Sequence, residues 1–525
     1  MLWVPRPVAK LGVGDGVGGA YVPHPKLRYG MGHPAWGVLP DEQLGRVNLG
    51  DMMPTITHRI AEWAAGVSYD DLPSEAVDAA KRFLFDTLGC AIGGSQVRDC
   101  RIFIDHYRAL EQPGPCTVIG SGERMNVVAA GMLNALMTRS MDYNDIYWKQ
   151  DPSHPSDLAS AALAIAEWKH LSGKDLLVGL VLGWDITMRL CHIALPGIRE
   201  RGWHHATLMA FATPVVAGRM LGLSAEQIQH AIGIASCHRF TLGCAVAGKL
   251  TMMKNTVSPL ATRDGVEAAL LAQRGYTGPE GVIEGKEGME HCLGEGWDYS
   301  WITGKLPGPD AQAATADSPA GEGWMITQCG MKSFPFEALM HSPVSAALSI
   351  VKEHDLAPET IERVRIESIA RAADILSDPA KYDPQSKESA DHSLPYCIAA
   401  AITDRTVTPR QFKDERLWDE RLRAQMKKVK VVANEEFERA FPAKQCTRVT
   451  ITTTDGRQFS AERDFPKGDP RDPMTVDEIS DKFDALAESV LSKDRRVELK
   501  DAIFALDKLD DVGKLLALCV TDQSS

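Results

Sequence analysis

Apolar residues recur at helical spacing through most of the first half of this chain, and no other feature constrains its fold as strongly. Several of the helical segments are apolar nearly all round and rich in Ala and Gly, which predicts close packing and some fully buried helices. A large all-α bundle is therefore expected for this half. The candidate helices cover residues 56–66, 74–93, 125–141, 156–171, 174–192, 204–221, 224–237 and 257–274.

The pattern changes after about residue 325. Residues 364–368 alternate apolar and polar like a strand, and residues 447–465 are typical of a hairpin that turns at Asp455-Gly456. Helices are expected between them at 341–353, 389–404 and 433–439, and purely helical patterns return at 479–491 and 495–506. Capping boxes, formed by Ser224 with Gln227 and by Thr475 with Glu478, support two of the helix starts.

These patterns predict a mainly α fold, with a large all-α helical domain built from both ends of the chain and a smaller α+β lid domain inserted between them. The expected boundaries are 1–54 for a Gly/Pro-rich N-terminal extension, 55–325 for the first part of the helical domain, 326–468 for the lid and 469–525 for the C-terminal part. Residues 1–51 have no continuous apolar core after a basic start, so no signal peptide is expected. Translation starting at Met52 or Met53 is a hypothesis that the intact mass of the native protein tests.

Charge and cysteine spacing restrict the function classes. A net charge of -13 over 525 residues argues against binding to nucleic acid or to anionic membranes, because both require a basic surface. The most apolar run, 176–184, stops at Asp185 and is too short to cross a bilayer. The eleven cysteines contain no CxxC pair, so buried, reduced thiols in a cytoplasmic protein are expected and an aconitase-like iron–sulfur cluster is not, although cysteines distant in sequence could still converge.

One connection between two helical patterns concentrates ionisable groups. It contains Asp142-Tyr143-Asn144-Asp145 and then His154-Pro155-Ser156-Asp157. Acids and a histidine held between helices could place a proton donor and acceptor against a small substrate. The alternative is structural, because Asp145 and Asp157 can also cap the following helix and Tyr143 can simply pack.

Four other segments place ionisable groups beside helix starts or glycines. Lys254 and Lys332 lie among apolar neighbours, where an ammonium group is costly unless an anion pairs with it. Two such lysines with several histidines would suit a substrate that carries several carboxylates. Each residue alone also has an ordinary explanation, as a helix cap, a core histidine or a solvated lysine. The segments are Gly202-Trp203-His204-His205, residues 248–254, residues 329–335 and Ala390-Asp391-His392-Ser393. In the last of them, Asp391 or Ser393 can cap the helix that follows.

Taken in order, these motifs resemble the signatures of the MmgE/PrpD family, which contains 2-methylcitrate dehydratase, cis-aconitate decarboxylase and related epimerases. The similarity runs from about His58 to the C-terminus. It implies a homodimer with a helical domain, a lid domain, an active site in the cleft between them, and no metal or other cofactor. The motifs are Asp142 to Asp145, His154 to Asp157, Gly202-Trp203-His204, Met253-Lys254, Lys332 to Pro335 with His341-Ser342, Ala390 to Tyr396, and Asp469 to Met474.

The resemblance also implies roles for individual residues. His154 is the first choice for proton transfer and Asp142 would orient or tune it. Lys254, Lys332 and His204 would hold carboxylates and stabilise developing charge. Substrate contacts are further expected from Asp145, His341 and His392. We expect alanine at His154 or at Lys254 to abolish turnover without unfolding the protein.

The residues at positions 142–145 indicate which reaction of the family to expect. In the decarboxylase branch a loop resembling Asp-Asp-Tyr-His stands at positions 142–145, and the Asp391-His392 pair is absent. The expected activity is therefore that of a hydro-lyase that converts 2-methylcitrate to 2-methylaconitate, in propionate catabolism. Trp148, Lys149 and the segment 255–259 depart from the family pattern and could change the substrate. The alternatives are cis-aconitate decarboxylase, another lyase or epimerase of the family, and a non-catalytic binding protein on the same scaffold.

Overall fold

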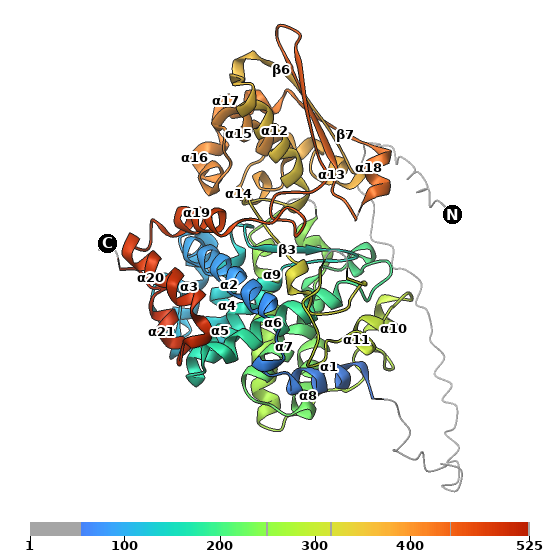
Figure 1. Cartoon of the computed structure of the whole chain (residues 1–525), viewed down its shortest axis with the longest axis vertical. Coiled ribbons are helices and arrows are strands. Elements are labelled where there is room, and N and C mark those ends of the chain that lie inside the picture. Colours follow the sequence, from blue (N-terminus) through green and yellow to red (C-terminus); the bar gives the residue numbers. More distant parts are fainter. Residues whose placement is uncertain (1–53, 248–249, 316–317, 442, 523–525) are drawn as a thin grey trace, which may run out of the picture. The chain divides into compact units, whose positions relative to one another are not determined.

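Eight long helices form where the helical spacing predicts them (Figure 1). The computed structural model describes residues 54–525 except 248–249, 316–317, 442 and 523–525. The expectations for the N-terminal extension and for Gly248 and Lys249 lie outside the described residues. The eight helices are α1 (Ile56–Gly66), α2 (Ser74–Gly94), α4 (Val127–Arg139), α5 (Ala159–Lys169), α6 (Gly173–Leu190), α7 (Ala206–Met220), α8 (Ala225–Ser236) and α9 (Met253–Gln273).

The expected burial of whole helices is confirmed most clearly for α7, in which every residue except Arg219 is buried. Small residues allow the helices to approach closely. A Cβ atom added at Gly94 on α2 would lie 1.9 Å from the carbonyl oxygen of Met137 on α4, so only glycine fits at this crossing. The pattern missed α3 (Arg98–Ala109), in which only Asp99, Cys100 and Ile104 are buried.

The C-terminal helices α19 (Val476–Ala487), α20 (Lys493–Phe504) and α21 (Val512–Ala517) return to the first half of the chain and pack beside α2 and α5 (Figure 1). Phe483 stacks on Phe85, with ring centroids 4.4 Å apart, inside one continuous core made from both ends of the chain. Lys482 forms a buried ion pair of 2.6 Å with Asp86. Residues from both ends of the chain therefore pack together in the core of the helical part.

A four-stranded sheet with its own apolar core forms in the middle of the chain. Its order is β7-β6-β8-β9, with β6 parallel to β7 and antiparallel to β8. The predicted hairpin is confirmed as β8 and β9, and Gly456 at its turn has a φ of 85°. The strand β7 was not predicted. The elements are β6 (Ile361–Ser368), β7 (Val429–Ala433), β8 (Thr447–Thr453), β9 (Gln458–Arg463), α12 (His341–Glu353), α13 (Ala370–Ile375), α14 (Lys387–Ala390), α15 (Leu394–Asp404), α16 (Asp414–Leu417), α17 (Glu420–Met426) and α18 (Glu435–Ala440).

Several short strands and helices lie outside these two groups. Of these, β3 antiparallel to β5 matters most for the site, because it joins the ionisable loop to the segment around Lys332. Trp148 at the end of β3 belongs to the core of the α+β part rather than to that of the helical part. Whether the two cores are separate domains with the predicted boundaries stays a prediction. The short elements are β1 (Pro113–Thr117), β2 (Arg124–Met125), β3 (Asp145–Trp148), β4 (Pro152–Ser153), β5 (Gly330–Met331), α10 (Met289–Leu293) and α11 (Ser300–Thr303).

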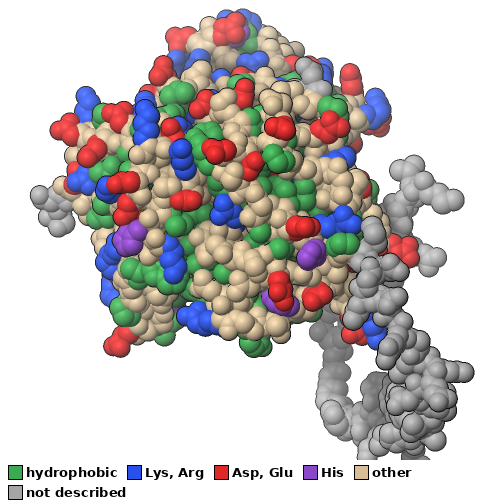
Figure 2. Space-filling model, turned by 60° about the horizontal axis from the view of Figure 1, so that its bottom comes forward, with side chains coloured by type: hydrophobic (Ala, Val, Ile, Leu, Met, Phe, Trp, Pro, Cys, Tyr) green, Lys and Arg blue, Asp and Glu red, His purple; other side chains and the backbone are tan. Residues whose placement is uncertain are grey.

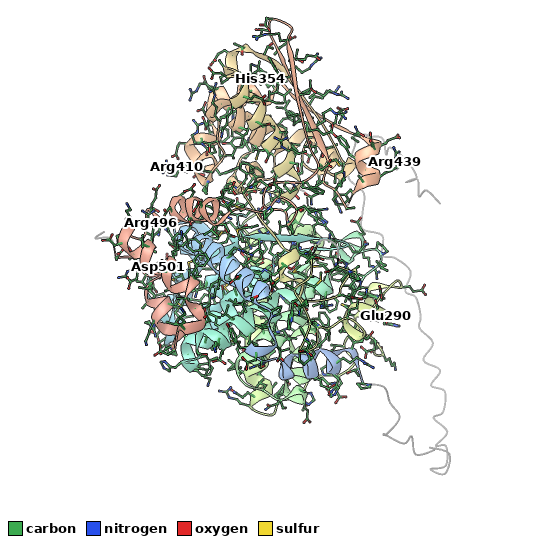
Figure 3. All side chains as sticks on the ribbon, viewed as in Figure 1. Glu290, His354, Arg410, Arg439, Arg496 and Asp501 are labelled. Carbon is green, nitrogen blue, oxygen red and sulfur yellow. The ribbon has the colours of Figure 1, made fainter. Side chains whose placement is uncertain are left out.

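The surface mixes acidic and basic side chains, as Figure 2 shows for one face, and the charged side chains labelled in Figure 3 lie at the periphery. Within the described residues, no helix has the length and apolarity needed to cross a membrane. None of the eleven cysteines is paired, but the expectation that they are buried is wrong for three of them. Cys237, Cys244 and Cys292 are exposed.

Candidate functional site

Asp142 lies at the centre of a buried cluster of charged side chains. It follows the last turn of α4 and has a φ of 51°, a left-handed conformation that Asp tolerates better than most residues. Its carboxylate pairs with Arg139, with Lys332 Nζ at 2.8 Å and with Lys254 Nζ at 3.5 Å. Burial alone would raise the pKa of Asp142, but Lys254, Lys332 and Arg139 together lower it well below its ordinary value. Asp142 is therefore ionised and holds both lysines in place.

A second buried carboxylate, Asp391, completes the cluster. Lys254 Nζ lies 3.2 and 3.3 Å from its two oxygens, and Lys387 Nζ lies 3.0 Å away. Although burial raises the pKa of Asp391, Lys254 and Lys387 lower it below its ordinary value. Lys254 thus bridges Asp142 and Asp391, which are far apart in sequence. Four cationic side chains surround two carboxylates in this network, so its ion pairs carry an excess of positive charge.

The ion pairs of Asp142 and Asp391 limit the binding of a metal ion at this cluster. Possible ligand atoms of Asp142, Asp391 and His392 lie within 4.8 Å of one another. The ammonium group of Lys254 already bonds to both carboxylates, so a metal ion would have to displace it.

His154 is held with one ring nitrogen available as a base. Its Nδ1 atom lies 2.6 Å from the backbone carbonyl oxygen of Asp145. Because a carbonyl oxygen only accepts hydrogen bonds, Nδ1 carries the proton and Nε2 of the neutral ring keeps a free lone pair. Burial lowers the pKa of His154 well below its ordinary value, and the nearby charges of Arg139 and Lys332 lower it further. His154 is therefore neutral near pH 7.

His204 shows the opposite tautomer. Its Nδ1 accepts a hydrogen bond of 3.1 Å from the backbone N–H of Ala206 at the start of α7, so the neutral ring carries its proton on Nε2. Burial lowers the pKa of His204 to about 3. His204 can donate a hydrogen bond from Nε2, whereas His154 can accept one.

His205 lies near both of these histidines, with its ring centroid 4.0 Å from that of His204 and 5.6 Å from that of His154. The residue is 6% exposed, and its Nε2 atom has no hydrogen-bond partner within the described part of the chain. Leaving a buried polar atom unpaired is costly, and such atoms are rare in folded proteins.

Among the described residues, Asp145 forms no ion pair with a lysine. Its carboxyl group accepts hydrogen bonds from the backbone N–H of Ser156 at 3.1 Å and from the Ser156 hydroxyl at 2.6 Å. Burial raises the pKa of Asp145 to about 8, and that of Asp157 to about 7. Of the two acids considered as caps, Asp145 contacts the backbone at the start of the next helical turn, while Asp157 accepts from the Asn144 side chain. Tyr143 packs, with its hydroxyl donating to the carbonyl oxygen of Ser333.

The two remaining expected histidines occupy different surroundings. His392 Nδ1 lies 2.7 Å from the Asp391 carboxylate, so His392 joins the charged cluster. His341 lies at the start of α12 against the rings of Phe334 and Phe336, and burial lowers its pKa to about 3. Together with Lys332, His341 borders a cavity of about 170 Å³.

The structure also places residues in the site that the sequence analysis did not select. Arg139 is the one charged residue in α4, and this isolation was a signal that could have identified it. Lys387 precedes Asp391 by one helical turn on α14, a spacing typical of an ion pair. Asp391 appeared in a motif, where a helix cap was one interpretation. The cap of α15 is instead Ser393, which accepts from the N–H of Tyr396.

Two family domains match this chain. Residues 58–302 match the MmgE/PrpD N-terminal domain, and residues 334–507 match the MmgE/PrpD C-terminal domain. The chain belongs to the MmgE/PrpD family. The resemblance drawn from the motifs is thus confirmed, and the two matched regions fall largely on the two apolar cores.

Several MmgE/PrpD relatives are similar over most of the chain. Cis-aconitate decarboxylase of Aspergillus terreus is 27% identical over 482 residues, covering 88% of this chain and 95% of its own length. Cis-aconitate decarboxylase of Mus musculus is 25% identical over 486 residues, covering 89% and 94%. 2-Methylcitrate dehydratase of Salmonella typhi is 25% identical over 419 residues, covering 75% and 82%. These relatives are therefore lyases of two kinds, decarboxylases and a dehydratase.

Proposed function

We propose that this MmgE/PrpD protein is a lyase that removes water from a hydroxy polycarboxylate, with 2-methylcitrate as the first candidate substrate. The observation that carries the proposal is the neutral, buried His154 with a free Nε2 atom beside the cationic cluster of Lys254 and Lys332. Taking a carbon-bound proton next to a carboxylate requires a base, and the charge that develops on that carboxylate requires cations.

The same geometry supports a division of roles. His154 Nε2 takes the proton from carbon, and the electron pair of that C–H bond forms the double bond as the C–O bond breaks. The departing hydroxide needs a proton. Lys332 can supply it as an ammonium group, because burial lowers the pKa of Lys332. His204 is unsuited to that step, since a neutral imidazole that loses its proton becomes an imidazolate, but its Nε2–H can hold a carboxylate oxygen.

Decarboxylation of cis-aconitate is the second candidate. It is favoured by the two decarboxylase relatives, which are similar over a larger share of the chain than the dehydratase is. The available base favours dehydration instead, because loss of carbon dioxide requires cations and a proton donor but no group to take a proton from carbon.

One experiment separates the candidates. The purified protein is incubated separately with 2-methylcitrate, citrate and cis-aconitate, while ultraviolet absorbance follows the alkene and a second assay follows carbon dioxide. We expect alkene formation from 2-methylcitrate without release of carbon dioxide. Carbon dioxide and itaconate from cis-aconitate would establish the decarboxylase. No change with any acid, together with tight binding of a protein partner in calorimetry, would favour a non-catalytic binding protein.

Further proposals follow from the family resemblance. They are assembly as a homodimer, which analytical ultracentrifugation tests, a cytoplasmic location, and a place in propionate catabolism. The absence of a required metal or other cofactor is tested by comparing turnover before and after exhaustive treatment with a chelator.

A further inference from the structure

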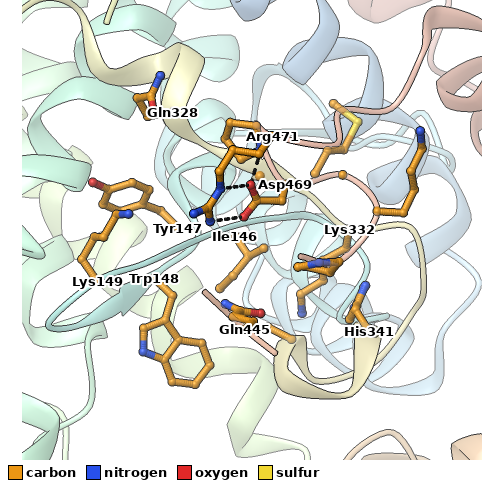
Figure 4. A pocket seen from close by; sticks show the side chains of 17 residues that line it. Ile146, Tyr147, Trp148, Lys149, Gln328, Lys332, His341, Gln445, Asp469 and Arg471 are labelled. Carbon is orange, nitrogen blue, oxygen red and sulfur yellow. Dashed lines mark hydrogen bonds and ion pairs between the residues drawn. The ribbon is translucent and has the colours of Figure 1, made fainter. Parts of the chain in front are cut away.

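A cavity of about 170 Å³ lies between β3, β5 and the segment 466–471 (Figure 4). An apolar cavity of about 150 Å³ in another protein holds benzene, so this one has room for part of a small organic acid. Most of the charged groups on its wall are cationic. They are Lys149, Lys332, Lys467 and Arg471, with Asp469 as the acid.

Three of these cations are already paired. Lys332 pairs with Asp142 at 2.8 Å, and Arg471 binds Asp469 through two nitrogens at 2.7 and 2.8 Å. Lys467 lies 3.3 Å from Asp472 and 3.2 Å from Glu478. The protein itself therefore neutralises most of the positive charge at the cavity wall.

Lys149 differs from the other three. Within the part of the chain that the structure describes, no carboxylate lies within 4.0 Å of its ammonium group. Its nearest ring contact is with Tyr147, whose centroid is 5.9 Å from Nζ. Burial lowers the pKa of Lys149 and the charge of Arg471 lowers it further, while the carboxylate of Asp469 raises it. Lys149 is partly buried, and an anion bound beside its ammonium group would offset the cost of its partial desolvation.

We infer that the cavity is a carboxylate-binding subsite, in which Lys149 pairs with a ligand carboxylate remote from the reacting carbon and so selects polycarboxylates. In Figure 4, Lys149 lies at one side of the cavity while Lys332 and His341 lie together at the other. Lys332 belongs both to the cavity wall and to the cluster around Asp142, so a ligand in the cavity adjoins the proposed catalytic groups. The inference rests on the proposed function in that it assigns the subsite to the same substrate.

Binding of an unreactive acid tests the subsite. Propane-1,2,3-tricarboxylate has no hydroxyl group and cannot lose water, so its affinity is measurable by calorimetry without turnover. We expect the Kd to rise about tenfold in Lys149→Met, since a hydrogen bond to a charged group contributes about that much. The matched control is Lys169→Met, which removes the same charge from an exposed lysine that also lies over an aromatic ring, Trp168. The Kd of that variant should not change.

The outcomes separate this inference from the proposed reaction. Equal affinity of the wild type, Lys149→Met and Lys149→Gln would overturn the subsite, whether or not the protein turns over 2-methylcitrate. An equally large Lys149-dependent loss of affinity for inorganic phosphate would overturn the assignment to carboxylates. A Lys149-dependent Kd for the tricarboxylate in a protein that transforms none of the three tested acids would support the subsite and refute the proposed reaction.

Discussion

The Nδ1 atom of His154 lies 2.6 Å from the backbone carbonyl oxygen of Asp145 and fixes the tautomer of that ring. The contact joins the first residue of β3 to the residue that follows β4, so the fold of this loop aligns the base. It leaves Nε2 free in a buried and positively charged environment. This relationship makes His154 the residue whose removal should affect chemistry most directly.

Replacing His154 with alanine should lower kcat by about 10²–10⁴, the usual contribution of a general base. The folded state should be retained, as judged by circular dichroism. His170→Ala is the control, because His170 is exposed and, among the described residues, pairs with Asp511 alone. Near-normal kcat in His154→Ala would remove His154 from its proposed role.

Lys254 should affect stability as well as turnover. The ammonium group is fully buried and pairs with Asp142 and Asp391. Both carboxylates keep other cationic partners in Lys254→Met, so the loss of the bridging hydrogen bonds should cost about 1–3 kcal/mol of unfolding free energy. The sequence predicted a loss of turnover without unfolding, and the buried ion pairs add the expectation that the variant is also less stable. Adding Asp391→Asn to Lys254→Met should recover part of the lost stability in urea denaturation. If the single variant were no less stable than Lys514→Met, which breaks an exposed pair with Asp510, the buried network would not be stabilising.

Asp145 should make stability depend on pH. Its pKa is raised to about 8 in the folded protein from an ordinary value near 3.8. Between these values the folded state binds a proton that the unfolded chain lacks, so the unfolding free energy falls as pH rises. Asp145→Asn removes that titration, and its stability relative to wild type should increase from pH 5 to pH 8. Asp455→Asn is the control, because the pKa of this exposed acid is lowered and its effect should be constant over that range. A constant difference for Asp145→Asn would contradict the raised pKa.

His205 should contribute more to activity than to stability. Its buried Nε2 atom has no partner among the described residues, so His205→Phe should leave the unfolding free energy unchanged or raise it. The kcat/KM should fall about tenfold if the substrate supplies the missing partner. His204→Phe offers a contrast, since it also removes the acceptor for the Ala206 N–H and should destabilise the start of α7 by about 1 kcal/mol. Unchanged kcat/KM in His205→Phe would exclude contact with the substrate.

Helix packing can be tested separately from chemistry. Gly94→Ala places a methyl group 1.9 Å from the Met137 carbonyl oxygen and should destabilise the fold by at least about 1–3 kcal/mol. Gly66→Ala at the end of α1 meets nothing within 4 Å and should stabilise by about 0.5–1 kcal/mol. Thermal denaturation of both variants measures the difference. Equal melting temperatures would mean that α2 and α4 can separate at little cost.

The helices could be predicted because their causes are local. Apolar spacing located α7, and the Ser224 and Gln227 side chains that cap α8 bond as the sequence indicated. Strand β7 and helix α3 were missed. Helix α3 buries only Asp99, Cys100 and Ile104, and β7 buries only Val429. The motifs drew attention to Lys254 and to Asp391, but their ion pair joins residues 137 positions apart. No local pattern specifies such a contact.

The sequence by itself determined the helical character of most of the chain, the family, and the types of residue available for chemistry. Only the tertiary structure decided which of these residues meet and in which protonation state. Asp142 is ionised because three cations surround it, whereas Asp145 in the same loop favours its proton because burial is not offset by a cation. Among the described residues Lys149 forms no ion pair, whereas Lys332 pairs with Asp142. The reason is physical, since helix formation depends on neighbours in sequence, but ionisation depends on the charges and solvent that the folded chain places around each group.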